Sequence, residues 1–572
     1  MNKIEKLKKL FDSYNIDGYI IPKNDEFFGE YIPAHKDNLK FISAFSGSYG
    51  YALILKKKNY LFVDGRYTLQ AKIQSGRQFR IVTMPKRYPL DVLGNKNLTI
   101  GFDPKLHTDV MNNRLFGKSS CKLISINENL VDKIWIRKNI NESNKFYNLN
   151  DKDAGESSNN KIKKISKLLD KNKVNFQFVS APENVAWLLN LRGSDSEFTP
   201  IPNSYLMIDN KNIIYFFCNL NKINKKFKNN FKSINIINIK YIKQFFLKIK
   251  NKKILIDKVS CSIFLRDVIK KNNIIVEKQD PLYFFKSIKN KTEIKNTVMT
   301  HIYDGVALTK FLFWVKNNFK NKKISEISAQ EKLLKLRKNI KTFKSLSFPT
   351  ISGSGPNGAI IHYKASKKSN RILKKGDLYL VDSGGQYNFG TTDVTRTISL
   401  SNNESKVKNI FTRVLKGHIA VANYKLNKNT CGSEIDIAAR KPLKKINLNY
   451  AHGTGHGVGY FLNVHEGPHA ISSGNKVKFK EGMIVSNEPG YYESKKFGIR
   501  IENLITVKKV NKKLKFENLT MAPIDKSLID KNLLNRIEIS WLNNYHLKVF
   551  NNLKKFMNKS ELIDLKNSCS NI

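Results

Sequence analysis

The chain has 572 residues, and its 101 lysines and arginines outnumber 47 aspartates and glutamates, which gives a formal net charge of +54 at pH 7. This length exceeds what one hydrophobic core organises, so we expect about three or four domains. The basic residues are spread along the chain without forming a basic arm, which argues against nucleic acid as a partner, and no stretch approaches the ~18 apolar residues of a membrane-spanning helix.

Cysteine usage points to a reducing compartment. The five cysteines lie far apart and form no C-x-x-C pair. This spacing does not fit a disulfide framework or a thiolate zinc site. The N-terminus also has no apolar signal core. We therefore expect a soluble, cytoplasmic protein with no membrane contact.

The front of the chain has the pattern of an α/β unit. Residues 4–11 place apolar side chains on one face of a helix, and residues 19–21 form a short apolar strand. Residues 52–55 and 60–63 are apolar runs on either side of a Lys/Asn turn. They predict a β-hairpin.

A second segment repeats the landmarks of the first. Residues 10–12 have a counterpart at 168–170, and residues 46–48 have one at 192–194. Any helix followed by a strand begins alike, but both landmarks recur in the same order, which favours a duplicated α/β unit. The polar stretch 148–160 between the copies predicts a linker.

From about Thr292 the pattern changes to helical spacing, and a further helix is expected over residues 324–336. Glycine-rich strands follow as far as Val507. The remainder predicts a helical tail, whose aromatic residues are expected to pack or to cover an interface.

The densest motif is HGTGHGVG at residues 452–459, continued by NVHEG at 463–467. Alternate glycines weaken an isolated strand, but they suit a backbone that must approach its neighbours closely. A glycine-rich loop with incidental histidines is the alternative. Six of the ten histidines lie between 362 and 469, which favours a site that uses imidazole.

Four carboxylates lie at the ends of apolar strands. Asp382 and Asp393 are eleven residues apart, so a strand, a turn and a returning strand could bring them together. Glu488 follows another apolar strand, and Glu502 shares one strand face with Arg500. Any single acidic residue is more often on the surface. Buried carboxylates that lie close together would repel one another, and a divalent cation between them would neutralise this repulsion.

With His456 these acids make five ligands, mostly oxygen donors. Two divalent ions would balance four negative charges. Such ligands suit manganese or cobalt and tolerate zinc or iron. Paired ions of this kind can supply hydroxide at neutral pH.

These residues carry a family resemblance. The motifs VDSGG, TTDVTRT, HGTGHGVG, NVHEGP, NEPGYY and IRIEN occur in that order from residue 381 to 503. Together they resemble aminopeptidase P, the Xaa-Pro aminopeptidases of the pita-bread metallopeptidases. Residues 187–194 resemble the second domain of the long three-domain form, and residues 541–543 resemble its C-terminal extension.

The resemblance implies an α/β and α+β fold. Two creatinase-like α/β domains would span 1–147 and 148–290. A pita-bread catalytic domain with a curved antiparallel sheet would span 291–510, and a C-terminal extension would span 511–572.

The resemblance also implies roles for the ligands. Asp382 would bind one metal, and His456 and Glu488 would bind the other. Asp393 and Glu502 would bridge the two. Creatinase, which shares the fold without using metal, lacks this full set.

Further roles follow from the same resemblance. Glu488 would also take a proton as the metal-held hydroxide attacks. His362 and His465 match histidines that orient the scissile carbonyl and stabilise the oxyanion, and His452 matches the one beside the proline subsite. Arg500 and Tyr492 match the family's residues that hold the acidic ligands in place.

The implied function is a dinuclear-metal aminopeptidase that hydrolyses the N-terminal Xaa-Pro bond of peptides. Two divalent ions are expected, with Mn²⁺ first and Co²⁺ or Zn²⁺ as alternatives, in a homodimer. Prolidase, restricted to dipeptides, is the alternative enzyme. A non-catalytic pita-bread protein that binds histones or nucleic acid would suit the charge, but it predicts a degenerate metal site.

Overall fold

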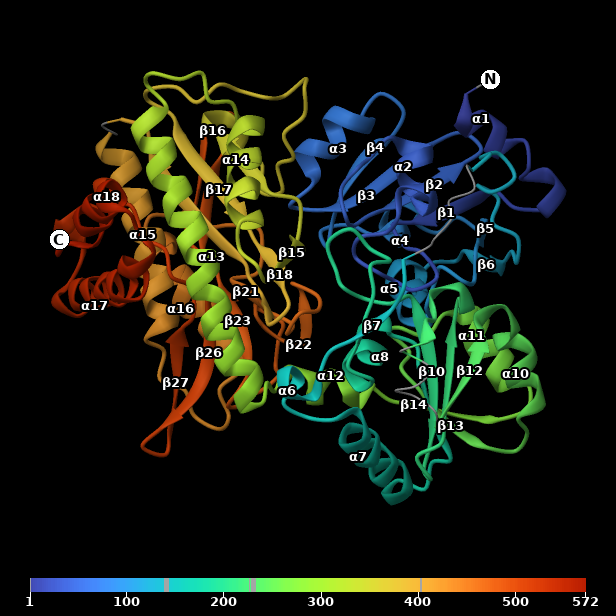
Figure 1. Ribbon diagram of the computed structural model, residues 1–572. Coiled ribbons are helices and arrows are strands. Elements are labelled where there is room, and N and C mark those ends of the chain that lie inside the picture. The colour runs from blue at the N-terminus through green and yellow to red at the C-terminus, as the bar shows by residue number, and fades with distance from the viewer. Residues whose placement is uncertain (1, 138–143, 226, 228–232, 402–403) are drawn as a thin grey trace. The chain divides into compact units, whose positions relative to one another are not determined.

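The protein is described from a computed structural model, which covers residues 2–137, 144–225, 227, 233–401 and 404–572. The chain divides into two compact units, Met1–Tyr283 and Phe284–Ile572 (Figure 1). Among the residues covered, no helix is both long enough and apolar enough to cross a lipid bilayer.

The first half of unit 1 contains a six-stranded mixed sheet. Its strands, in spatial order, are β4 (Arg80–Met84), β3 (Asn59–Asp64), β2 (Tyr51–Leu55), β1 (Gly18–Pro22), β5 (Thr99–Phe102) and β6 (Lys122–Ser125). The central strand β1 is buried along its whole length, as an apolar strand covered on both faces should be. The β2–β3 pair is antiparallel, so the predicted hairpin is confirmed.

The second half of unit 1 contains another six-stranded sheet. Its strands, in spatial order, are β12 (Ile234–Asn238), β11 (Ile214–Cys218), β10 (Ser204–Asp209), β8 (Phe176–Val179), β13 (Lys253–Ile256) and β14 (Ile274–Glu277). The order of the neighbours and their directions match the first sheet pair by pair. The predicted duplication of an α/β unit is therefore confirmed.

The predicted linker over residues 148–160 is partly wrong. Helix α6 (Asp151–Ala154) lies within it, and helix α7 (Ser158–Lys171) begins before its end. Ser157 caps α7 by accepting a hydrogen bond from the backbone N–H of Asn160. The first turn of α7 is entirely polar, and its buried apolar face begins only at Ile162, so periodicity could not mark its start.

Helices surround the sheets of unit 1. Besides α6 and α7 they are α1 (Lys3–Lys8), α2 (Asn38–Ser43), α3 (Thr68–Ser75), α4 (Pro89–Leu93), α5 (Asp109–Phe116), α8 (Pro182–Leu188), α10 (Ile242–Lys248) and α11 (Ile263–Lys270). Helix α12 (Pro281–Ser287) spans the boundary between the two units. Two short strands, β7 (Tyr147–Asn148) and β9 (Leu191–Arg192), pair outside the two sheets.

Unit 2 begins with the helices that the spacing predicted. These are α13 (Lys291–Asn318) and α14 (Glu326–Lys338), and later helices are α15 (Ser405–Ala422), α16 (Gly432–Lys444), α17 (Arg536–Leu553) and α18 (Lys559–Cys569). Asn290 and Glu293 form a reciprocal capping box that fixes the start of α13.

The strands of unit 2 form antiparallel pairs throughout the described part of this unit. A three-stranded sheet has the order β16 (Ile351–Ser354), β17 (Leu378–Ser383) and β20 (Val394–Ser399). A five-stranded sheet has the order β22 (Glu466–Ile471), β21 (Gly455–Gly457), β23 (Ile484–Asn487), β26 (Asn503–Val510) and β27 (Lys513–Asn518). Smaller sheets contain β15 (Phe343–Leu346), β18 (Gly385–Tyr387), β19 (Gly390–Thr391), β24 (Gly490–Glu493) and β25 (Phe497–Arg500).

The helices of unit 2 cover these sheets. Apolar side chains of α13 and α14 pack with those of β17 and β20, while those of α15 and α16 pack with those of β22, β23 and β26. The backbone N–H of Glu502 donates to the carbonyl of Thr395 at 3.2 Å, so the two larger sheets meet beside β20. The expected architecture, two α/β domains followed by an antiparallel-sheet domain backed by helices, is confirmed.

Candidate metal centre

Strands β17 and β20 bring the first two carboxylates together. Asp382 lies on β17 opposite Thr395 in the antiparallel register, and Asp393 directly precedes β20. Both side chains are buried, with relative exposures of 8% and 4%. The hairpin of β18 and β19 forms the turn between them. The expected arrangement of a strand, a turn and a returning strand is therefore present.

The histidine–glycine motif contributes the short strand β21, which lies between β22 and β23 in the five-stranded sheet. A Cβ on Gly455 would lie 1.9 Å from the carbonyl oxygen of Ser486, and one on Gly457 would lie 2.3 Å from that of Glu466. The predicted close backbone approach is confirmed at these positions, whereas Gly453 has only ordinary contacts. The register of the β21–β22 pair shifts between His456 and Gly457, so the ladder is interrupted beside the imidazole.

Backbone hydrogen bonds to neighbouring segments hold the two glutamates in place. The N–H of Glu488, directly after β23, donates to the carbonyl of Thr454 at 2.8 Å. Glu502, which lies between β25 and β26, is bound to the carbonyl of Thr395 as described above. The Glu502 side chain is 1% exposed, and Glu488 is half-buried.

The predicted ligands converge. Ligand atoms of Asp393, His456 and Glu502 all lie within 4.8 Å of one another. The Nε2 atom of His456 is 3.4 Å from Oδ2 of Asp393 and 3.5 Å from Oε1 of Glu488. Asp382 interacts electrostatically with Asp393 and Glu488. The structure thus brings all five side chains into one cluster.

Burial and mutual repulsion hold protons in this cluster. Burial raises the pKa of Asp382 to about 7, and the carboxylates of Asp393 and Glu488 add to this increase while Arg500 opposes it. Burial also raises the pKa of Glu502 well above its ordinary value, and the same two carboxylates contribute. Carboxylates in this state lack a counter-charge.

The pKa of His456 also reflects the excess of negative charge in this cluster. Burial lowers its pKa, but the nearby carboxylates of Asp393 and Glu488 outweigh this effect and raise the pKa to about 9. The imidazolium is therefore, beside Arg500, a cation that these acids share, and a bound metal would replace its proton.

The donor set fits divalent cations. Oδ2 of Asp382 accepts a hydrogen bond from Arg500 at 2.6 Å, while the buried Oδ1 has no hydrogen-bond partner among the described residues. A buried carboxylate oxygen without a donor needs a cation or water. Four carboxylates and one imidazole are hard, oxygen-rich ligands of the kind that divalent metals prefer.

Arg500, Tyr492 and His452 form a chain beside the acids. Arg500 donates to Asp382 and also to the hydroxyl of Tyr492, at 2.6 Å. That hydroxyl lies 2.9 Å from Nε2 of His452. The structure thus connects the predicted proline-side histidine to the acids through the two residues predicted to hold them.

The remaining two histidines lie in different settings. The ring of His465 is 4.3 Å from that of His456, nearly perpendicular to it, so it lies against the cluster. His362 is half-buried on the loop after the 3₁₀ turn Gly355–Ala359. This turn packs closely on β25, since a Cβ on Gly498 would lie 1.8 Å from the carbonyl oxygen of Gly358.

Sequence reasoning missed two hydroxyls. Thr395 donates to Oε2 of Glu502 at 2.7 Å and accepts from Nε of Arg500 at 2.9 Å. Ser486 donates to Oε1 of Glu488 at 3.1 Å. Each lies two residues from a proposed ligand, Asp393 or Glu488, so strand alternation was a signal that could have identified both.

Comparisons with known proteins agree with this geometry. Residues 3–134 and 137–293 match the Creatinase/Prolidase N-terminal domain, 299–509 match Metallopeptidase family M24, and 512–572 match the C-terminal region of peptidase M24. A probable Xaa-Pro aminopeptidase P of Laccaria bicolor is 37% identical, over 97% of this chain and 90% of its own length. The chain belongs to metallopeptidase family M24.

Other M24 proteins extend the comparison. Xaa-Pro aminopeptidase 1 of Dictyostelium discoideum is 38% identical over 96% of this chain and 92% of its own. The crystal structure of X-prolyl aminopeptidase from Caenorhabditis elegans, described as a cytosolic enzyme with a di-nuclear active site, has a TM-score of 0.94 and 31% identity. It covers 100% of this chain and 99% of its own. A prolidase from Thermococcus sibiricus has a TM-score of 0.52 at 25% identity and covers 64% of this chain and 98% of its own.

Proposed function

We propose that this M24 protein is an Xaa-Pro aminopeptidase that uses two divalent cations to hydrolyse the N-terminal Xaa-Pro bond of peptides. One observation carries the proposal. Four buried or half-buried carboxylates and His456 converge in one cluster whose charges do not balance without cations. The names of the full-length relatives support the substrate class.

The five ligands divide between the two cations. Asp382 would hold one, and His456 with Glu488 would hold the other. Asp393 and Glu502 would bridge them, a role taken from the family resemblance, and their ligand atoms lie within 4.8 Å of each other and of a ring nitrogen of His456. The electrostatic coupling of Asp382 to Asp393 and Glu488 supports its place in the same centre.

When bound, the cations would polarise the substrate carbonyl and lower the pKa of a bound water towards ~7. Glu488 would accept the proton that the attacking water loses, since its half-buried carboxylate faces His456 and is oriented by the Ser486 hydroxyl. The raised pKa of Glu488, caused mainly by burial, suits a group that takes up a proton and then releases it.

The histidines around the cluster would handle the substrate. His465, against His456, and His362, on its loop, would donate to the scissile carbonyl and to the oxyanion. His452 would lie beside the proline ring. An Xaa-Pro bond has no N–H, so a peptidase that binds this N–H fails, whereas a site that receives the ring can select it.

Prolidase remains the alternative enzyme, and it is less well supported. The prolidase of Thermococcus sibiricus matches only 64% of this chain, whereas the aminopeptidase relatives match nearly all of it. Comparing Arg-Pro-Pro with an Xaa-Pro dipeptide separates the two. We expect hydrolysis of the tripeptide, and activity on the dipeptide alone would favour prolidase.

Several finer features belong to the same proposal. We infer Mn²⁺ as the metal, with Co²⁺ or Zn²⁺ as alternatives, because the ligands are mostly oxygen donors. A homodimer and a cytoplasmic location are inferred from the family, and the Caenorhabditis elegans relative is described as cytosolic. We propose domains over 1–147, 148–290, 291–510 and 511–572, in the same order as the matched family ranges, of which the second begins earlier, at residue 137.

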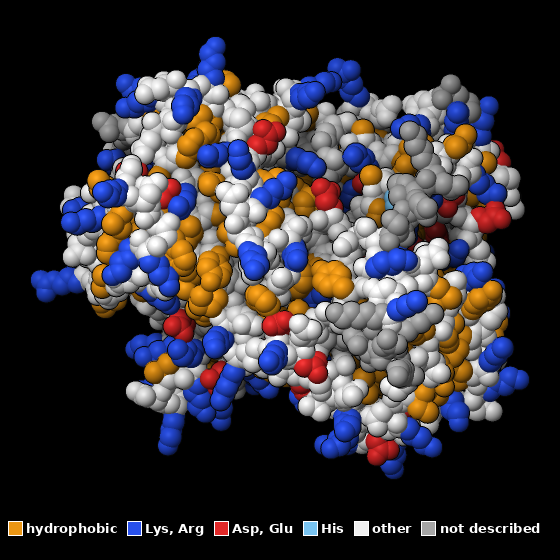
Figure 2. All heavy atoms as spheres, viewed as in Figure 1, with side chains coloured by type: hydrophobic (Ala, Val, Ile, Leu, Met, Phe, Trp, Pro, Cys, Tyr) orange, Lys and Arg blue, Asp and Glu red, His pale blue; other side chains and the backbone are white. Residues whose placement is uncertain are grey.

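A non-catalytic role in binding nucleic acid is not favoured by any specific observation. Figure 2 shows that Lys and Arg side chains are scattered over the visible face among other residue types and do not form one basic patch. The proposed ligand set is also complete, whereas a binding protein with no catalytic role would not need it.

The test of the function is a metal-reconstitution assay. Chelated and dialysed protein should lose activity on Arg-Pro-Pro, and adding Mn²⁺, Co²⁺ or Zn²⁺ separately should restore it to different extents. Full activity in the thoroughly demetallated protein would contradict the proposal.

A further inference from the structure

A fully buried arginine connects the candidate metal centre to the C-terminal extension. Arg396 is 1% exposed and lies three residues after Asp393. Its Nη1 donates to the backbone carbonyl of Glu502 at 2.6 Å. Its Nη2 donates to the side chain of Asn503 and to the hydroxyl of Tyr545, both at 2.8 Å. One guanidinium therefore joins the backbone of Glu502, a proposed bridging residue, to a tyrosine of the tail.

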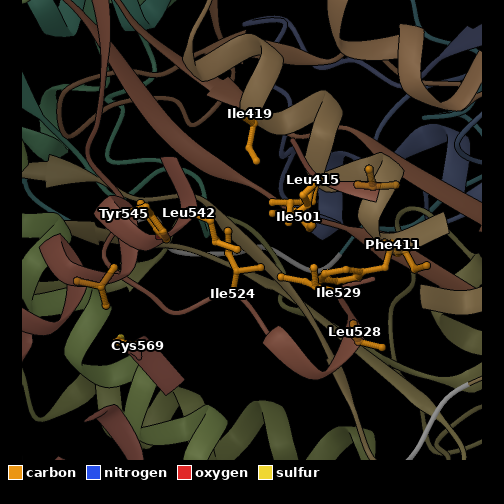
Figure 3. Close-up of a cluster of buried hydrophobic side chains, with 14 of the residues drawn as sticks. Phe411, Leu415, Ile419, Ile501, Ile524, Leu528, Ile529, Leu542, Tyr545 and Cys569 are labelled. Carbon is orange, nitrogen blue, oxygen red and sulfur yellow. The ribbon is translucent and has the colours of Figure 1, made fainter. Parts of the chain in front are cut away.

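Tyr545 is held tightly in its place on α17. Its hydroxyl donates to the carbonyl of Ala522 at 2.8 Å, and its ring stacks on Trp541 with a centroid separation of 5.4 Å. Figure 3 shows Tyr545 and Leu542 in the apolar cluster that also contains Ile501, the residue before Glu502. The position of the hydroxyl is thus fixed by packing on one side and hydrogen bonds on the other.

A second path leads from the same helix to Glu488. The ring of Trp541 meets that of His418 edge-on at 5.7 Å. Nδ1 of His418 donates to the carbonyl of Asn487 at 3.1 Å, and the amide of Asn487 donates back to the carbonyl of His418 at 2.9 Å. Asn487 directly precedes Glu488. Neighbouring residues of α17 therefore contact the supports of both glutamates.

We propose that α17 is a positioning element of the metal centre, in which Tyr545 orients Glu502 through Arg396 and Trp541 orients Glu488 through His418. Partners behind the ligands fix ligand orientation, and their loss typically lowers metal affinity ~10–100-fold. The inference rests on the proposed function, since it concerns the metals that this function requires. Neither aromatic residue is one of the proposed ligands or substrate-binding histidines, so both would act through Arg396 and His418.

A purely structural role for α17, as a cover of the apolar core, makes a different prediction. Tyr545→Phe keeps the ring, its stacking and its packing, and it removes only the hydroxyl that Arg396 contacts. If α17 serves only as a cover, the variant should bind metal normally. If α17 positions Glu502, metal binding should weaken although the fold is retained.

The experiment titrates Mn²⁺ into demetallated native protein and the Tyr545→Phe variant by calorimetry, and records the visible spectrum of each protein loaded with Co²⁺. We expect about a tenfold or greater loss of affinity for at least one ion and a changed Co²⁺ spectrum. The matched control is Tyr303→Phe. Tyr303 packs on Phe556 of the same extension at 5.9 Å, and its hydroxyl forms no hydrogen bond among the described residues.

Trp541→Phe tests the second path with an aromatic ring retained, and we expect a smaller loss of Mn²⁺ affinity. Native affinity and an unchanged Co²⁺ spectrum in Tyr545→Phe would overturn the inference, as would an equal loss in Tyr303→Phe. If the native protein bound no Mn²⁺, the proposed metal centre itself would be wrong, and this inference would fail with it.

Discussion

Both units of the chain bury carboxylates, but they do so in different ways. In unit 1, Asp280 accepts hydrogen bonds from the side-chain amides of Gln177 and Asn184, each at 2.7 Å. Asp195 of the same unit pairs with the buried Lys222. Each acid there has its own donors. In unit 2 the proposed ligands share one arginine and one histidine.

The comparison shows that a raised pKa alone does not mark a metal centre. Burial raises the pKa of Asp280 to about 6, close to the value of about 7 for Asp382. Both oxygens of Asp280 accept hydrogen bonds, however. Oδ1 of Asp382, in contrast, has no hydrogen-bond partner among the residues that the structure describes, and two neighbouring carboxylates oppose ionisation of Asp382. Mutual repulsion combined with an unsatisfied oxygen is the more specific signal.

Glu466 shows that unit 2 can also balance a buried acid. Burial raises its pKa, but Lys286 and Lys289 outweigh burial and lower the pKa below its ordinary value. Lys289 contacts Oε1 at 2.5 Å, and Lys286 is 3.2 Å from Oε2. Within the described part of the chain, no lysine pairs with the proposed metal ligands, so the excess of negative charge is specific to that cluster.

The largest expected effect comes from neutralising one acid in each unit. Glu502→Gln should lower kcat/KM on Arg-Pro-Pro by about 10³-fold, because a bridging ligand supports several kcal/mol of transition-state stabilisation. Asp280→Asn, equally buried, should leave kcat/KM within about twofold of native. Steady-state kinetics measures both, and a comparable loss in the two variants would remove the distinction between the units.

Metal binding should stabilise one unit only. A ligand at a hundred times its Kd stabilises the folded state by about 2.7 kcal/mol. Adding Mn²⁺ to demetallated protein should therefore slow amide exchange in β17, β20 and β23, and leave β1 and β8 unchanged. Hydrogen exchange read by mass spectrometry resolves these strands. Equal protection in β8 would show that binding is not local to unit 2.

Acid should destabilise both units through buried histidines. Burial lowers the pKa of His107 in unit 1 to about 4 and that of His546 in unit 2 to about 3. Each is neutral when folded, whereas the unfolded group titrates near ~6.5, so this stability is present above pH ~6.5 and is lost as pH falls towards 4.

His107 alone should contribute a loss of about 2 kcal/mol between pH 7 and pH 5. In His107→Phe, urea unfolding should show a pH 7 to pH 5 difference smaller by that amount, whatever the variant's stability at pH 7. An unchanged difference would mean that His107 does not remain neutral in the fold.

The smallest effect should come from one hydroxyl. Tyr492→Phe removes the contact between Arg500 and His452 and should lower kcat/KM about tenfold. Tyr491→Phe is the matched control, because its ring packs on Phe497 while its hydroxyl forms no hydrogen bond among the described residues. Equal activities in the two variants would mean that the chain from Arg500 to His452 is not used.

The sequence predicted most of the features that depend on short stretches of the chain. Strand alternation placed Arg500 and Glu502 on one face, and both now contact the same hydroxyl, that of Thr395. Glycine spacing predicted the close approach at Gly455 and Gly457. The repeated landmarks also predicted the duplicated sheets, because each short motif carries its own structural requirement.

What the sequence did not predict depends on distant contacts. Arg396 and Tyr545 are 149 residues apart, and nothing in the periodicity of either segment indicates the other. The start of α7 was missed because its first turn is polar, and the tail aromatics were expected only to pack or to cover an interface. Tertiary contacts define these features.

The most direct measurement is the number of metal ions that each chain holds. Protein equilibrated with excess Mn²⁺ and then freed of unbound metal should retain two ions per chain by elemental analysis. Asp280→Asn should also retain two, and Glu502→Gln should retain fewer than two. Retention of no metal by the native protein, or of two ions by Glu502→Gln, would contradict the convergence of these five residues on a pair of cations.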